Sequence, residues 1–436
     1  MRATGHSLRP GLRIDRTANN VLAMWSTRAS SERALHAGAF AISASFMVVF
    51  PLLPDLQERA GISTAQLGWI AASGFVAALV AQTLIAPHAD RGRERWVING
   101  AIVMMALSTV VYAVGDSIHW FIAGRIGAGL AYGAFTPAAI GLIVRRWPEA
   151  PGRHIGRLQA IELAGMALGP LLAVAGKVWL GVLPTLWVAG ALTLLAGVPA
   201  FASREVRSTA GLGRVGQAAD TPHHSLASGF GLLRHRSVIA AALVMTAFFV
   251  PIGAYDALFP RFLVDLGSSD WLVGAALMAF AIPSMFLATW AGRTVDRLGP
   301  FRAASLGGAA NVAVILTYGF VRVPMVIVVI GLFESGGQTL VGAAGAAAMG
   351  WAVPGRRAAT AQGLGEATAT TAGAAVAFLA APLYAAGGPA LLFVTTAVLT
   401  AGPLALGVRL ARTARPVEEP VPVATVADDP LLAASR

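Results

Sequence analysis

The sequence predicts an all-α integral membrane protein whose twelve transmembrane helices form two pseudo-symmetric halves of six. The first observation is composition: 56% of the 436 residues are hydrophobic, only 12% are charged, and the mean hydropathy is +0.69. Soluble domains carry about 25% charged residues, so this chain has too few to cover a soluble fold. The second observation is the recurrence of apolar segments of about 20 residues, the length that spans a bilayer. The third is a charged motif that occurs in both halves.

Each half contains six predicted spans. In the first half they are residues 34–53, 67–87, 96–114, 120–144, 155–179 and 182–202. In the second half they are residues 237–259, 271–291, 303–321, 324–349, 358–383 and 389–408. The predicted organisation is therefore an N-terminal tail (1–33), a first half (34–202), a linker (203–236), a second half (237–408) and a disordered C-terminal tail (409–436).

The basic residues predict the orientation. Most of the 32 Lys and Arg residues fall in the two tails, the linker and alternate loops, which the positive-inside rule assigns to the cytoplasm. The net charge of +11 is thus a topology signal rather than a sign of nucleic-acid binding. We expect a multi-pass protein of the cell's inner (plasma) membrane, with both termini cytoplasmic. The N-terminal tail (1–33) lacks the apolar core of a cleavable signal peptide, and Met24 is an alternative start of translation.

The sequence argues against an enzyme. It has no cysteine, no GxxxxGK[ST] phosphate loop and no HExxH pattern among its eight histidines. We therefore expect no metal site and no cofactor, and energy supplied by a proton gradient. The expected partners are the bilayer, protons and a small-molecule substrate, and the expected state is a monomer.

The loop after the second span of each half carries the repeated motif. Its members are Asp90, Arg91, Gly92 and Arg93 in the first half, and Gly292, Asp296, Arg297 and Gly299 in the second. Two halves that share one motif indicate a duplicated transporter architecture.

At these residues the chain resembles the major facilitator superfamily, whose signature is GxxxDRxGRR between the second and third helices. Ala86 replaces the leading glycine of the first copy, and Gly92 comes one position early. The resemblance implies that Asp90 and its neighbours help to latch the halves together on the cytoplasmic side. The alternative is that Asp-Arg after a helix is merely a solvated turn.

The fifth span adds an element similar to the GxxxGP motif of the family's drug:proton antiporters, formed by Gly165, Gly169 and Pro170. The glycines permit close helix packing, and the proline permits a bend. Ordinary helix packing is the alternative. In the fourth span, Arg125 and Gly129 resemble the family's RxxxG element, with Arg125 in the place of its buried arginine.

Ionisable residues inside the bilayer are costly and are functional candidates by default. Burial favours the neutral form of a carboxyl group, as a proton carrier requires. We rank Glu334 and Glu162 first as proton-coupling or substrate-binding residues. Glu366 ranks next and Asp256 last, and Arg125 is expected to pair with one of these acids or to bind an anionic group. Four of these residues have an alternative role: Asp256 as a wet helix end, Glu162 and Glu366 as duplicated gating residues, and Arg125 as a structural ion-pair partner or a helix–helix packing contact. Glu334 near the midplane, with glycines beside it, is best explained as part of a cavity wall.

These features predict a proton-coupled multidrug antiporter that exports small lipophilic or cationic compounds by alternating access. The first alternative is a proton-coupled importer, or symporter, of a nutrient or organic anion. The second is a membrane scaffold or sensor that does not transport. The substrate does not follow from these residues, because one fold hosts many.

Overall fold

The computed structural model describes residues 14–147, 151–202, 231–353 and 358–417, and these residues form helices and short connections without a strand. In the first half the α-helices are α1 (Ile14–Arg59), α2 (Thr64–Val80), α3 (Glu94–Val114), α4 (Ile118–Arg146), α5 (Pro151–Leu180) and α6 (Val182–Ala202). Two short π-helices, η1 (Ala81–Ile85) and η2 (Ala89–Arg93), connect α2 to α3.

The second half follows a single 3₁₀ turn, η4 (Gly231–Arg234). Its helices are α9 (Arg236–Asp265), α10 (Asp270–Leu298), α11 (Pro300–Tyr318), α12 (Pro324–Ala352) and α13 (Ala358–Ala411). The long α13 is interrupted at Gly387 and Gly388, where the backbone is not helical and Gly388 has a φ of +64°. A left-handed φ costs little only for glycine, so this pair marks the junction of two helices.

Each of the twelve predicted spans coincides with a helix, and the last two lie on either side of the break in α13. The spans 67–87 and 303–321 run two or three residues past the ends of η1 and α11. Among the described residues, nine helices are long and apolar enough to cross a bilayer by length and composition, and α13 is counted once among them. One difference concerns the N-terminus, where α1 begins at Ile14 and so extends well into the predicted tail. The predicted linker (203–236) and C-terminal tail (409–436) fall mostly outside the described residues.

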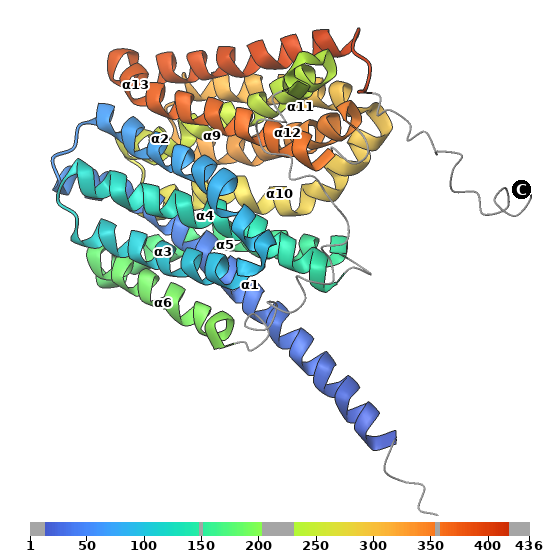
Figure 1. Cartoon of the computed structure of the whole chain (residues 1–436). Coiled ribbons are helices and arrows are strands. Elements are labelled where there is room, and N and C mark those ends of the chain that lie inside the picture. The colour runs from blue at the N-terminus through green and yellow to red at the C-terminus, as the bar shows by residue number, and fades with distance from the viewer. Residues whose placement is uncertain (1–13, 148–150, 203–230, 354–357, 418–436) are drawn as a thin grey trace, which may run out of the picture.

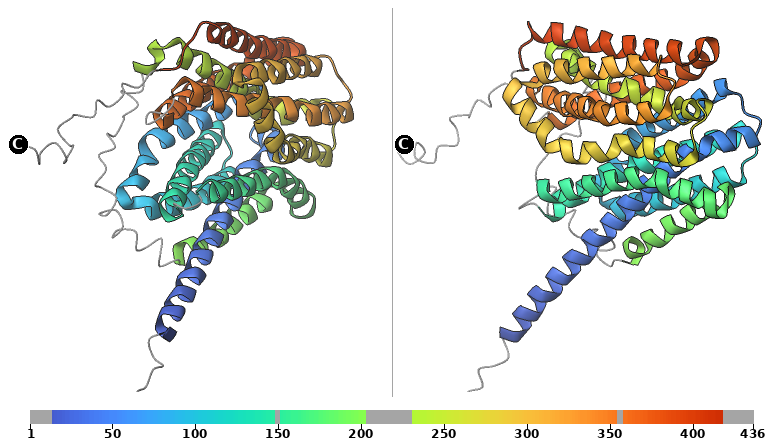
Figure 2. Two further views of the ribbon diagram at one scale, coloured as in Figure 1. Left: turned by 90° about the vertical axis from the view of Figure 1, so that its right-hand side faces the viewer. Right: turned by 180° about the vertical axis from the view of Figure 1, so that it is seen from behind.

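Helices α1–α6 pack mainly with one another, and α9–α13 do the same (Figure 1). The two groups meet chiefly where α2 lies beside α13 and where α5 lies beside α10. The views from the side and from behind show the same division, with α1 projecting away from the bundle at its N-terminal end (Figure 2).

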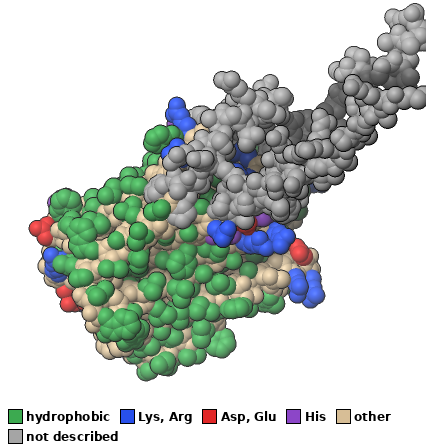
Figure 3. Space-filling model, turned by 90° about the horizontal axis from the view of Figure 1, so that it is seen from below, with side chains coloured by type: hydrophobic (Ala, Val, Ile, Leu, Met, Phe, Trp, Pro, Cys, Tyr) green, Lys and Arg blue, Asp and Glu red, His purple; other side chains and the backbone are tan. Residues whose placement is uncertain are grey.

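The flank of the bundle is apolar. Large hydrophobic side chains are exposed along it, including Trp96 (77%), Trp179 (79%), Phe286 (77%) and Phe333 (75%). Figure 3 shows apolar side chains covering the face in view, with charged side chains at the two ends. An apolar belt between charged ends is the surface expected of a protein that lies in a bilayer.

Candidate functional site

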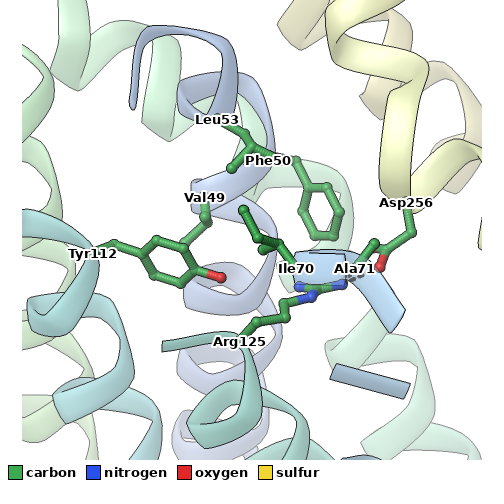
Figure 4. A pocket seen from close by; sticks show the side chains of 8 residues that line it. All are labelled: Val49, Phe50, Leu53, Ile70, Ala71, Tyr112, Arg125 and Asp256. Carbon is green, nitrogen blue, oxygen red and sulfur yellow. Dashed lines mark hydrogen bonds and ion pairs between the residues drawn. The ribbon is translucent and has the colours of Figure 1, made fainter. Parts of the chain in front are cut away.

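Arg125 and Asp256 form a buried ion pair that joins the two halves (Figure 4). Arg125 projects from α4 and Asp256 from α9, and Nη2 of the arginine donates to both carboxylate oxygens. The two side chains are only 6% and 8% exposed. The expectation that Arg125 pairs with an acid thus finds its partner in Asp256, the acid ranked last. Asp256 is therefore a buried ion-pair partner in this structure rather than a wet helix end.

The surroundings of the pair are aromatic and closely packed. The guanidinium carbon lies 4.5 Å from the ring centre of Phe46 and 4.7 Å from that of Phe50, both on α1. Gly74 of α2 leaves room for the arginine, because a Cβ atom there would lie 2.7 Å from its Nε. A cavity of about 10 Å³, roughly the space of one water molecule, adjoins the pair and is lined also by Leu53 and Tyr112. Aromatic faces and low solvent access strengthen the electrostatic interactions of this arginine.

Two further ion pairs cross between the halves at the end of the bundle that the positive-inside rule assigns to the outside. Lys177 of α5 contacts Asp270 of α10 at 2.6 Å, and also Asp55 of α1 at 2.9 Å. Arg261 of α9 contacts Glu58 of α1 at 3.1 Å. We call Lys177–Asp270 and Arg261–Glu58 the outer pairs. Together with Arg125–Asp256 they connect the two halves at this end.

Glu334 has a different environment, inside the second half. It lies on α12 and is 1% exposed. Tyr255 of α9 donates to one of its carboxylate oxygens, and Tyr318 of α11 donates to the other at 2.7 Å. The rings of Phe259, Phe280 and Phe393 pack around these tyrosines. The Glu334 side chain is therefore enclosed by aromatic residues of its own half.

Glu162 and Glu366 lie on α5 and α13. The Thr136 hydroxyl of α4 donates to Glu162 at 2.7 Å, and the glutamate is 6% exposed. Within the described part of the chain, Glu162 has no cationic partner. Glu366 is exposed in the isolated chain and hydrogen-bonds to Gln362. The structure does not bring these two acids together with Arg125.

The repeated loop motif contains one glycine with a left-handed φ in each half. Gly92 and Gly299 each have a φ of +78°, a conformation that side chains disfavour, which explains a glycine at each place. Asp296 and Arg297 are exposed. The side chains of Asp90 and Arg91 lie outside the described residues, so a role in latching the halves stays a prediction.

The helix-five motif packs α5 against α1 inside the first half. A Cβ atom on Gly165 would lie 2.6 Å from the Phe40 carbonyl oxygen, and one on Gly169 would lie 2.6 Å from that of Ala44. Pro170 lies inside the helix one residue later, and its carbonyl oxygen faces Gly274 of α10 in the other half. The motif therefore supports close packing next to the interface of the halves.

Sequence reasoning missed three features of this site. Tyr318 was not a candidate, because a tyrosine at a helix end gives no signal of its partner. The acidic partners of Lys177 and Arg261 were not predicted either. Each outer pair joins residues far apart in the chain, so only the packing of the halves reveals it. The one available signal is that Lys177 and Arg261 fall on the predicted outer side, where basic residues are few.

Comparison with known proteins gives the family. The family model of the Major Facilitator Superfamily matches residues 35–378, most of the chain. The maltose permease of Geobacillus stearothermophilus is 28% identical over 284 residues, covering 64% of this chain and 68% of the permease. A multi-drug resistance efflux pump PmrA homologue from Lactococcus lactis is 26% identical over 165 residues, covering 36% of this chain and only 40% of the pump.

The fold agrees with a solved transporter. A bacterial homologue of the human lysosomal transporter Spinster, in an inward-facing and occupied conformation, superposes with a TM-score of 0.72 over 88% of this chain and 97% of its own. Their sequences are 14% identical, so the likeness is one of fold. From the family match and the helical fold, the chain belongs to the Major Facilitator Superfamily and is a multi-pass membrane transporter of small molecules rather than an enzyme.

Proposed function

We propose that the protein is a proton-coupled exporter of small lipophilic or cationic compounds in the plasma membrane, with both termini in the cytoplasm. The Arg125–Asp256 ion pair carries the proposal, because it joins the two halves at a buried point where they must separate. Alternating access requires one end of the bundle to open while the other closes. The proposed transporter acts as a monomer.

Opening the outer end breaks three cross-half ion pairs at different costs. The outer pairs are partly exposed, so water replaces their partners at little cost. Arg125 and Asp256 are buried, and separating them leaves two uncompensated charges in a low-dielectric site, which costs several kcal/mol. Protonation of Asp256 removes one of those charges. We therefore infer that Asp256 takes up a proton when the outer end opens.

The return step releases the proton. Closing the outer end brings Asp256 back to the Arg125 guanidinium, which favours the charged carboxylate over the neutral acid. The proton must leave as the pair re-forms, and it leaves toward the end that is then open. One turnover thus moves one proton inward, and this drives the movement of the substrate. Glu334 remains the second candidate for the proton site.

The proposed cation subsite lies in the first half. Glu162 is an acid without a cationic partner among the described residues. Tyr132 of α4 lies between this region and Arg125, with its hydroxyl 3.9 Å from the Met166 sulfur and its ring 5.3 Å from that of Phe46. A carboxylate next to aromatic and thioether groups suits a lipophilic cation. The partial similarity to a multi-drug efflux pump supports the same substrate class.

A proton-coupled importer is the second candidate. The similarity to a maltose permease extends over more of the chain than that to the efflux pump, and it favours a neutral solute. An organic anion held by Arg125 fits less well, because Asp256 already neutralises that arginine. In the importer, the proton on Asp256 and the solute would move inward together.

The test is a substrate screen in vesicles that contain the purified protein and carry an imposed pH gradient. Export predicts that a transported cation releases protons from the acidic lumen as it enters the vesicle, while dissipation of the gradient stops its accumulation. Import predicts instead that sugar-like solutes move in the same direction as the protons. A panel of cations and neutral solutes that never alters the pH gradient would contradict both forms of coupling.

A further inference from the structure

A hollow lies at the end of the bundle that is predicted to be cytoplasmic, apart from the ion pairs between the halves. Its volume is about 620 Å³, and it is lined by Ile85, His88, Arg93, Trp96 and Val97. These residues come from η1, from the turn between the two π-helices, from η2 and from the start of α3. The two π-helices replace regular α-helical turns at this place, and the chain changes direction there.

The lining combines two kinds of surface. His88 and Arg93 supply hydrogen-bond donors, and Arg93 carries a positive charge that is exposed. Ile85, Val97 and the 77% exposed Trp96 supply an apolar wall. Among the described residues, the acid adjacent to Arg93 is Glu94, which is buried and faces Arg145 at 3.5 Å. Glu94 therefore does not occupy the hollow or neutralise it.

The position of the hollow matches the edge of the hydrocarbon layer. The apolar span of α3 begins at Glu94, so Arg93 lies at headgroup depth and Trp96 one turn deeper. Exposed tryptophan and arginine at that depth are typical interfacial anchors. A concave site adds room for a bound molecule, and basic pockets on the cytoplasmic side are suited to anionic lipid headgroups.

We propose that this hollow binds the headgroup of an anionic phospholipid, with the phosphate at Arg93 and His88 and the acyl chains along Trp96 and Val97. A soluble phosphate would use the donors alone and leave the apolar wall in contact with water. A zwitterionic lipid would bring its own cation next to Arg93. The inference does not depend on the substrate or on proton coupling.

The experiment measures lipid contact at Trp96 in the full-length protein reconstituted into bilayers. Brominated lipids quench tryptophan fluorescence on contact, and the difference between the unaltered protein and Trp96→Phe isolates the signal of this residue. We expect brominated phosphatidylglycerol to compete for the site about fivefold better than brominated phosphatidylcholine, since one basic residue near the surface is worth about 1 kcal/mol. The variant Arg93→Gln with His88→Gln should reduce that preference to about one, and Arg93→Lys should retain most of it.

The matched control is Arg302→Gln, which removes an exposed arginine near the start of α11 in the other half. It should leave the preference at Trp96 unchanged. Equal quenching by the two lipids would overturn the proposal. An unchanged lipid preference in the double variant would overturn it too, as would a loss of preference in Arg302→Gln as large as that in the double variant. Absence of quenching by either lipid would show that the chain itself covers Trp96. Displacement of the lipid by inorganic phosphate would show a site for a soluble anion. Both results would also overturn it.

Discussion

Two neighbouring residues of α9, Tyr255 and Asp256, belong to two different buried contacts. Asp256 extends to the first half and is paired with a full positive charge on Arg125. Tyr255 turns into the second half, where it and Tyr318 donate neutral hydroxyl groups to Glu334. The first arrangement changes whenever the halves separate, while the second lies within one half and moves as a unit. In the proposed mechanism, the location of an acid relative to the boundary between the halves, rather than its burial, decides whether it couples protons to transport.

The largest expected effect comes from removing one partner of the ion pair. Asp256→Ala leaves Arg125 charged and buried without compensation, which destabilises the fold by about 3–5 kcal/mol. Transport should be lost as well. Thermal unfolding in detergent, together with uptake in vesicles, measures the two effects.

A double variant separates folding from coupling in this prediction. Arg125→Met combined with Asp256→Leu replaces both charges with apolar side chains, so stability should return to near that of the unaltered protein. Transport driven by the pH gradient should still be absent. Gradient-driven transport by this double variant would contradict the proposed role of the ion pair, because coupling would then need no ionisable group at these two positions.

The next effect in size is at Glu334. Glu334→Gln keeps one oxygen that can accept a hydrogen bond from a tyrosine, but disturbs the second contact, at a cost of about 1–3 kcal/mol. Because these contacts lie in one half, we expect gradient-driven transport to persist. Unfolding temperature and vesicle uptake measure the variant, with Tyr318→Phe as its matched control. A folded Glu334→Gln protein that has lost coupling would restore Glu334 to the first rank that it holds on sequence grounds.

A smaller and more selective effect is expected at Glu162. Glu162→Gln removes the charge but keeps a group that can accept from Thr136. The KM for a cationic substrate should rise about tenfold, equivalent to about 1.4 kcal/mol, while that for a neutral substrate stays within a factor of two. Initial rates over a range of concentrations give both values. An equal rise for both substrates would mean that Glu162 shapes the fold rather than the cation site.

The smallest effect is expected at the outer pairs, which are partly exposed. Lys177→Gln should increase opening of the outer end by up to about fivefold, because such pairs contribute about 0.2–1 kcal/mol. The chain has no cysteine, so Leu53→Cys next to the Arg125–Asp256 pair gives a single labelling site. Its reaction rate with an impermeant maleimide in intact cells reports the opening. Unchanged labelling in Lys177→Gln would mean that this pair does not hold the end closed.

The sequence was sufficient for the fold because hydropathy acts locally. Each of the twelve spans is a run of apolar residues whose length is set by the thickness of the bilayer. The repeated Asp-Arg motif marks the same point, after the second span, in each half. The sequence also placed Arg125 and the acids at membrane depth. It did not indicate that Asp256, rather than Glu334, faces the arginine, because this depends on the direction in which the Asp256 side chain leaves α9. That direction is set by tertiary packing, and no local pattern records it.

The central claim is that the ion pair between the halves, rather than the acid enclosed in one half, couples protons to transport. The most direct measurement follows proton release from energised vesicles, with a pH-sensitive dye, on addition of a transported cation to the unaltered protein, Asp256→Asn and Glu334→Gln. The account predicts proton release by the unaltered protein and by Glu334→Gln, and none by folded Asp256→Asn. Release by Asp256→Asn at the rate of the unaltered protein would contradict it.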